Sequence, residues 1–305
     1  MAFERIVQRE LPDGTVSKVY PFHISLQGLE NALMCRQEED YGIMVKYFFL
    51  CARRKNVIVI MYIAMSNHAH VAILARDRLS AEAYQNELKR CYSLYFSHKY
   101  KEKELLRRTK AEVDYLDTDW YVRNALAYIP RNALDTGCRV EDYRWSGYRA
   151  MFRQGGPTGK TVLVRSLGRE QTIHLFHTRD RLSDVPWQLD TDGELLPETA
   201  CDKDYLESAF YKDQAIFLKT IGGVNTAEMK IRLLDNHYHM HKDTVFFKIV
   251  DDLARQWFNV GTMQLTPEQQ ARLIPFIKHT HRTTATQLAR CFGAERSFVE
   301  SILKR

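Results

Sequence analysis

The distribution of hydrophobic and polar positions in the first half of the chain predicts a set of short strands. Val57 to Ala64 and His68 to Leu74 are apolar runs separated by a turn at Ser66-Asn67. Runs of this length that are rich in Val, Ile and Tyr are typical of buried strands. Lys18 to Gln27 alternates more loosely and predicts an earlier strand, and Ala111 to Leu116 predicts an edge strand.

Helical periodicity separates these strands. Apolar residues recur at helical spacing from Tyr41 to Lys55, and a long helix is predicted from a cap at Ser80 to about residue 100. A third helix is predicted from Trp120 to about Leu134, after a capping sequence at residues 117–119.

Tyr128 and Asn132 lie four residues apart in this third helix and therefore share one face. Pro130 lies between them and should bend the helix. The alternative is a helix that ends at Ile129 and leaves Asn132 as a C-terminal polar residue.

The second half of the chain predicts a linker followed by a helical domain. A Gly-rich break near residue 155 suggests a first domain over 1–153, a linker and accessory region over 154–242, and a helical domain over 243–305. The accessory region should contain a small hairpin turning at Asp192-Gly193 and helices near 203–211 and 226–235.

Three helices are predicted at the C-terminal end, over 267–278, 284–291 and 297–304, with a tight turn at Phe292-Gly293-Ala294. The last two form a helix-turn-helix pattern, in which Arg296 and Ser297 would open the recognition helix and contact duplex DNA. The alternative is an ordinary three-helix packing unit.

Composition restricts the class of protein. With 305 residues, of which 45% are hydrophobic and 27% charged, the chain is expected to form a globular protein of two domains. Its apolar runs are too short to span a bilayer and its start lacks the apolar core of a signal peptide, so we expect no membrane partner and a cytoplasmic location. Six cysteines without a CxxC spacing argue against a zinc ribbon or a disulfide framework.

Charge patterning points to an anionic partner. The net charge is +6, and basic residues concentrate between residues 89 and 110, with aromatic residues among the first of them. Cations for phosphates and rings for base stacking are typical of a surface that binds single-stranded DNA. The candidates are Lys89, Arg90, Tyr92, Tyr95, Lys99, Arg107 and Arg108. The alternative is a solvated helix whose aromatic residues face the core.

A His-x-His pair opens the second of the central strands. Because side chains alternate along a strand, His68 and His70 should leave the same face of the sheet. Two imidazoles on one face can bind a divalent cation. The alternative is a pair of half-buried strand histidines.

Taken in order, five segments resemble the single-tyrosine HUH transposases, in particular the REP-associated tyrosine transposases. They are Phe22–Gly28, Met65–Val71, Leu88–Phe96, Tyr128–Ala133 and Asp142–Tyr148. The resemblance covers roughly residues 15 to 152. The chain departs from the family's usual pattern at Ser66, where relatives often have Pro, and at Ala133, where they often have Pro after Asn.

The resemblance implies a ferredoxin-like α+β fold with a central antiparallel sheet. It implies that His68, His70 and Asn132 bind Mg²⁺ or Mn²⁺ and that Tyr128 is the nucleophile. The implied activity is cleavage and rejoining of single-stranded or hairpin-flanked DNA through a covalent 5′-phosphotyrosine, by a monomer or a homodimer. Two rival interpretations are a non-catalytic, repressor-like DNA-binding protein on the same fold and an RNA-binding protein.

Overall fold

The computed structural model describes residues 3–27, 33–101, 110–152, 157, 159–223, 243–280 and 283–304. The chain divides into two compact units, Met1–Ile231 and Arg232–Arg305. Arg107 and Arg108, two of the candidate DNA contacts, lie outside the described residues, as does the helix predicted near 226–235.

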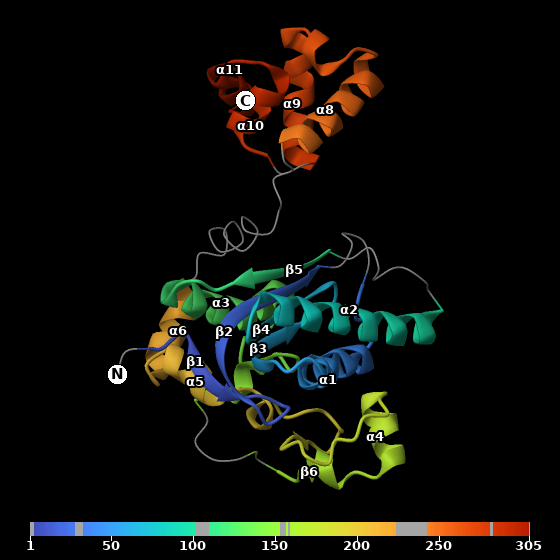
Figure 1. Cartoon of the computed structure of the whole chain (residues 1–305), viewed down its shortest axis with the longest axis vertical. Helices are drawn as coiled ribbons and strands as arrows, with labels where there is room; N and C mark the ends of the chain where they lie inside the picture. The colour runs from blue at the N-terminus through green and yellow to red at the C-terminus, as the bar shows by residue number, and fades with distance from the viewer. Residues whose placement is uncertain are drawn as a thin grey trace. The chain divides into compact units, whose positions relative to one another are not determined.

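The first unit is built on an antiparallel sheet (Figure 1). Its strands are β1 (Val7–Glu10), β2 (Val16–Gln27), β3 (Ile58–Ala64), β4 (His68–Ala75) and β5 (Lys110–Tyr115). The strand order is β5-β2-β4-β3, and β1 pairs with the first half of β2. The predicted strands are therefore confirmed, whereas β1 was not predicted.

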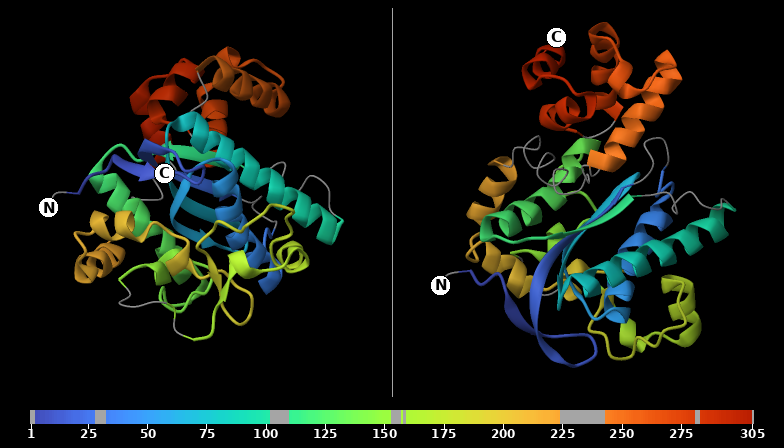
Figure 2. Two further views of the ribbon diagram at one scale, coloured as in Figure 1. Left: turned by 60° about the horizontal axis from the view of Figure 1, so that its bottom comes forward. Right: turned by 45° about the horizontal axis from the view of Figure 1, so that its top comes forward.

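Two helices, α1 (Glu38–Arg54) and α2 (Arg78–Tyr100), pack against one face of this sheet (Figure 2). The buried side chains Ile24, Val71 and Ile73 alternate along β2 and β4 and belong to the hydrophobic core on that face. The N-cap of α2 is Asp77, whose carboxylate accepts a hydrogen bond from the Ser80 amide at 2.7 Å. The expected cap at Ser80 was therefore three residues too late.

The helix α3 (Asp119–Arg131) packs against the same sheet through β3 and β4. The Thr118 hydroxyl caps it by accepting a hydrogen bond from the Tyr121 amide at 3.1 Å, within the predicted capping sequence. The α-helix ends one residue after Pro130 and continues as a 3₁₀ turn over Asn132–Thr136. The predicted helical course to about Leu134, ending near Gly137, is therefore confirmed, but it is 3₁₀ rather than α after Arg131, where the Asn132 amide bonds to the Ile129 carbonyl.

Residues 159–223 belong to the first unit rather than to a separate linker. They form β6 (Val162–Leu163), α4 (Arg169–Phe176), β7 (Gln188–Leu189), α5 (Lys203–Ala209) and α6 (Gln214–Gly223), with short 3₁₀ turns at Val164–Ser166 and Pro197–Thr199. A further 3₁₀ turn, Gly147–Ala150, precedes them. The predicted hairpin turning at Asp192-Gly193 is present: Gly193 has a φ of 78°, Leu189 and Leu195 form an antiparallel bridge across the turn, and β7 also pairs with β6. Both α5 and α6 pack against α3, so the expected boundary at residue 153 does not separate compact units.

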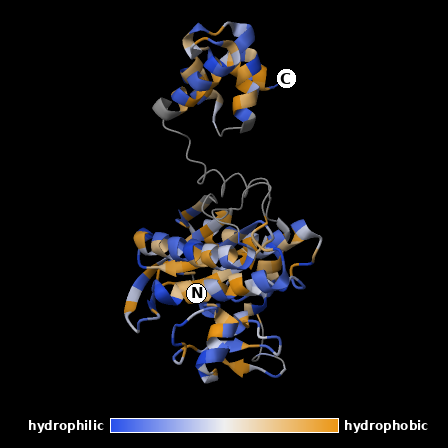
Figure 3. Cartoon of the chain, turned by 90° about the vertical axis from the view of Figure 1, so that its right-hand side faces the viewer, coloured by the Kyte–Doolittle hydropathy of each residue, from blue (hydrophilic) through white to orange (hydrophobic). Residues whose placement is uncertain are grey.

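The second unit contains α8 (Asp243–Phe258), α9 (Pro267–Thr280), α10 (Ala285–Phe292) and α11 (Arg296–Leu303), with a 3₁₀ turn at Thr262–Gln264. The three C-terminal helices are thus present where they were predicted. Leu288 and Val299 are fully buried in the core of this unit. Hydrophobic and hydrophilic positions alternate along the helices (Figure 3). Within the described residues, no helix combines the length and apolar character needed to cross a membrane.

Candidate active site

The two histidines of the His-x-His pair lie on one face of β4. In the register of the sheet His70 is opposite Ser25 of β2, and His68 is opposite Gln27. Their ring centroids are 5.1 Å apart. His70 is buried and His68 is half-buried. The prediction that both imidazoles leave the same face is therefore confirmed.

Helix α3 brings Tyr128 to this face. The Tyr128 and His70 ring centroids are 5.6 Å apart, with the rings at 72° to each other. Only 5% of Tyr128 is exposed. Burial raises the pKa of its phenol to about 12, an effect that Asp135 increases and a hydrogen bond with Asn132 reduces. The phenol is therefore protonated near neutral pH and would have to lose its proton as it attacks.

Asn132 has a structural role at the end of α3. Its side-chain nitrogen donates hydrogen bonds to the carbonyl of Tyr128 at 2.9 Å and to that of Ile129 at 3.2 Å. These bonds add a side-chain donor to carbonyl groups at the end of the helix, where backbone donors become scarce. The amide nitrogen is thus used in capping, which leaves the amide oxygen as the atom suited to a cation. That Asn132 is a metal ligand stays a prediction.

His23 and Asp114 form a second layer behind the pair, which the sequence interpretation did not identify. His23 is fully buried, and its Nε2 lies 3.1 Å from His70 Nδ1. Its Nδ1 lies 3.7 Å from the carboxylate of Asp114, which is opposite it on β5. Burial raises the pKa of Asp114, although the interaction with His23 acts in the opposite direction. The signal available in the sequence was polar alternation inside apolar strands, at His23-x-Ser25 and at Glu112-x-Asp114.

These contacts favour one tautomer of His70. At 3.7 Å the Asp114 carboxylate is too far for a hydrogen bond, but its charge favours the tautomer of His23 with the proton at Nδ1. In that tautomer His23 Nε2 carries a lone pair and accepts from His70 Nδ1. His70 Nε2 is then the nitrogen able to bind a cation. His68 has a parallel arrangement, because its Nδ1 lies 2.7 Å from Asn67 Oδ1. Partners of this kind at Nδ1 are usual for histidines that bind metals through Nε2.

The donor set therefore fits a divalent cation held by two imidazoles. Among the described residues, no group of three His, Cys, Asp or Glu side chains is placed to bind a metal ion. A third protein ligand would consequently have to be an amide oxygen, for which Asn132 is the candidate, and other positions would be taken by water or substrate oxygens.

The aromatic residues of α2 are core residues, which corrects the expectation that they stack on bases. Tyr92 is 1% exposed and donates to the Met34 carbonyl at 2.7 Å. Tyr95 is 7% exposed and donates to the Asp40 carboxylate at 2.8 Å. Rings buried in this way have no face available to a nucleotide base. The alternative interpretation of this segment, with its aromatic residues facing the core, holds for both.

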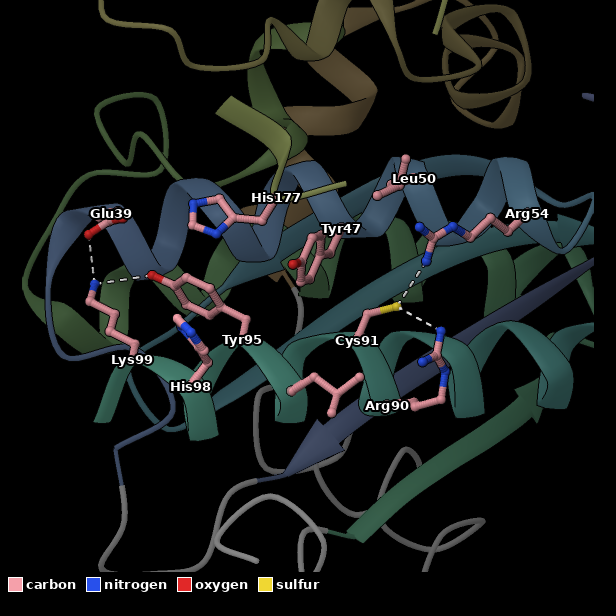
Figure 4. Close-up of a pocket in the computed structure, with 11 residues that line it drawn as sticks. Glu39, Tyr47, Leu50, Arg54, Arg90, Cys91, Tyr95, His98, Lys99 and His177 are labelled. Carbon is pink, nitrogen blue, oxygen red and sulfur yellow. Dashed lines mark hydrogen bonds and ion pairs between the residues drawn. The ribbon is translucent and has the colours of Figure 1, made fainter. Parts of the chain in front are cut away.

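The basic residues of α2 are mostly engaged with carboxylates. Lys99 lies 2.8 Å from Glu39 (Figure 4) and 2.7 Å from Asp40. Arg90 lies 2.7 Å from Glu87. Burial lowers the pKa of the half-buried Lys89. A cavity of about 480 Å³ lies beside Arg90 and Lys99, but each of these two cations already has an acidic partner. This cavity is therefore a poor candidate for binding phosphate.

Arg296 and Ser297 are exposed at the start of α11, and Arg296 pairs with Glu300 at 2.7 Å. Their position is compatible with contact to another molecule, and their role in DNA binding stays a prediction.

Comparison with known proteins adds little to this geometry. No family model matches the chain, and no curated protein does. One solved structure that it resembles is described as the structure of the REP-associated tyrosine transposase bound to a REP hairpin. The match has 13% sequence identity and a TM-score of 0.31, and it covers 42% of this chain and 76% of the other.

Proposed function

We propose that the first unit is a metal-dependent enzyme that cleaves and rejoins single-stranded DNA, a transposase-like strand transferase. The observation that carries the proposal is the convergence of His68, His70 and Tyr128 on one face of the sheet. The order of elements, β2-α1-β3-β4-α2-β5 with strand order β5-β2-β4-β3, is also that expected of a ferredoxin-like domain.

In the proposed reaction, the bound Mg²⁺ or Mn²⁺ would polarise the scissile phosphate and offset its developing negative charge. His68 and His70 would hold the cation, and the chain His70–His23–Asp114 would keep the His70 ring in place. The Tyr128 oxygen would attack phosphorus as the phenol loses its proton. The bond to the 3′ oxygen would break, giving a 5′-phosphotyrosine and a free 3′-hydroxyl. Attack by another 3′-hydroxyl would restore the phenol and join the strands.

A covalent-adduct assay tests this proposal. The full chain is incubated with Mn²⁺ and a library of 3′-labelled single strands that contain hairpins, and the products are separated under denaturing conditions. Wild type should carry the label, because the 3′ fragment stays on Tyr128. Tyr128→Phe should carry none while still binding the same DNA, since it lacks only the attacking oxygen. An adduct that persists in Tyr128→Phe would refute the assignment.

A non-catalytic DNA-binding protein is the second candidate, and the burial of Tyr128 favours it. A phenol that is 5% exposed must become accessible before a phosphate can reach it, whereas a binding protein has no such requirement. In that case α10 and α11 would act as a helix-turn-helix on duplex DNA. DNA binding without adduct or cleavage in Mn²⁺, and without any effect of EDTA, would support this candidate.

A further inference from the structure

Residues between β6 and β7 form an appendage that is fixed to α1. Phe176 and Leu182 are buried in the main hydrophobic core. Asp180 lies 2.6 Å from Arg54. Asp184 lies 2.8 Å from Arg53. The appendage is therefore anchored to the rest of the first unit by buried apolar side chains and by ion pairs with α1.

A cavity of about 350 Å³ lies in this appendage and is lined by four arginines. The four are Arg165, Arg169, Arg179 and Arg181. We name this cavity the arginine cavity. All four are exposed. The one acidic residue in the lining is Asp180, and its carboxylate is already paired with Arg54.

The four arginines gather around one cavity without a counter-charge of their own. Within the described part of the chain, none of them forms an ion pair or a hydrogen bond with a protein group. By contrast, Arg9, Arg53 and Arg76 each lie within 3.3 Å of a carboxylate. Like charges held close together repel each other, by about 0.6 kcal/mol per pair at 7 Å in water. Such a cluster is best explained by an anionic ligand.

Two threonine hydroxyls in the lining are used within the protein. Thr178 accepts a hydrogen bond from Arg54 at 3.0 Å, and Thr172 donates to the Gly168 carbonyl at 3.1 Å. The guanidinium groups therefore provide the main binding chemistry. Guanidinium forks bind phosphate oxygens in pairs, and several of them on one rim suit a ligand with several phosphates.

We propose that the arginine cavity binds successive phosphates of a DNA strand. The appendage packs against α1, which covers the face of the sheet lined by Ile24 and Val71, whereas the histidines lie on the face that carries Ser25. The bound segment would therefore be distinct from the phosphate that is cleaved. The identity of the ligand as DNA rests on the proposed function, but the phosphate chemistry does not.

The test compares two variants of the full chain with equal loss of charge. The first replaces three cavity residues, as Arg165→Gln, Arg169→Gln and Arg181→Gln. The control replaces three exposed arginines that are paired with carboxylates, as Arg78→Gln, Arg139→Gln and Arg255→Gln. Because all six residues are exposed, circular dichroism and thermal unfolding should match wild type for both variants.

Fluorescence anisotropy then measures binding of a labelled hairpin with single-stranded flanks, in EDTA, as a function of KCl. The cavity variant should lose affinity, and its plot of log K against log salt should become shallower by about 2, since each single-strand phosphate contact contributes about 0.7. The control should keep the wild-type slope. Equal changes in the two variants, or none in the cavity variant, would overturn the proposal.

Two further measurements complete the test. One distinguishes DNA from a small polyphosphate as the ligand, and the other separates the phosphate site from the proposed enzymatic function. Inorganic pyrophosphate that binds wild type but not the cavity variant, with unchanged DNA binding by both, would assign the cavity to a small polyphosphate and overturn its assignment to DNA. Adduct formation at saturating DNA should be the same in the cavity variant and wild type. If wild type forms no adduct while the salt slopes still differ, the proposed enzymatic function fails and the phosphate site stands.

Discussion

Asp40 offers a sharp test of whether the basic-aromatic face of α2 is structural. Its carboxylate is fully buried and accepts five hydrogen bonds. The donors to Oδ1 are Lys99 and Tyr95, and those to Oδ2 are Tyr100 and the amides of Arg36 and Gln37. Burial alone would raise the pKa of Asp40, but these bonds outweigh it and hold the pKa below its ordinary value.

Asp40→Asn should destabilise the first unit by about 3 kcal/mol. In asparagine an NH₂ group, which cannot accept a hydrogen bond, replaces one of the two carboxylate oxygens. If it replaces Oδ1, the oxygen with fewer donors, it faces the Lys99 ammonium and the Tyr95 hydroxyl. Losing a hydrogen bond to a charged group costs about 1.5–3 kcal/mol, and losing a neutral one costs about 1 kcal/mol. Glu39→Gln is the matched control, because Glu39 pairs with the same Lys99 at the surface and should contribute about 0.5 kcal/mol or less.

Urea denaturation of the full chain, followed by tryptophan fluorescence, measures this difference. Three of the four tryptophans, Trp120, Trp145 and Trp187, lie in the first unit. A loss of 3 kcal/mol should lower the urea midpoint by about 1 M or more. A loss below about 1 kcal/mol in Asp40→Asn would refute the view that these side chains form a structural network.

The pH dependence of the same variant provides a second check. Because the pKa of Asp40 is lower in the folded protein, its stabilising effect is complete above the ordinary pKa of about 3.9. It is lost as the pH falls below that value and the folded carboxyl becomes protonated. The difference in stability between wild type and Asp40→Asn should therefore be constant from pH 5 to 8 and become smaller below about pH 4.

Three other substitutions test separate parts of the structure. His23→Gln should weaken Mn²⁺ binding about 10- to 100-fold by removing the ring that positions His70, which calorimetric titration would detect, and an unchanged affinity would contradict that role. Gly147→Ala should lower the free energy of unfolding by about 1–3 kcal/mol, because its Cβ would lie 3.2 Å from the Tyr62 amide nitrogen; a thermal-unfolding curve identical to wild type would contradict this. Thr284→Ala should cost about 1 kcal/mol by removing the cap of α10, and calorimetry that finds no change in the unfolding of the second unit would count against it.

The elements of the proposed site follow from local patterns in the sequence. Alternation along β4 predicts that His68 and His70 share a face, since side chains in a strand point alternately to its two sides. Helical spacing after a capping sequence predicts α3, and so places Tyr128 and Asn132 one turn apart. Because these rules depend only on neighbouring residues, they hold here without knowledge of the rest of the fold.

The exposure of a helix face is not a local property. The rings of Tyr92 and Tyr95 recur at a spacing that suits a DNA-binding face and a core-facing face equally well. Their burial depends on α1, whose Asp40 lies more than 50 residues earlier in the chain and accepts the Tyr95 hydroxyl. The partners of α3 were missed for the same reason, because α5 and α6 follow it only after the whole appendage.

Sequence alone therefore determined four strands of the main sheet, most of the helices and the common face of His68 and His70. Tertiary structure decided which residues stand behind that face. His23 and Asp114 are 91 residues apart, and only the register of β2 with β5 makes them neighbours. The physical reason is that backbone sterics and side-chain alternation act over a few residues, whereas register and burial are settled by packing between distant segments.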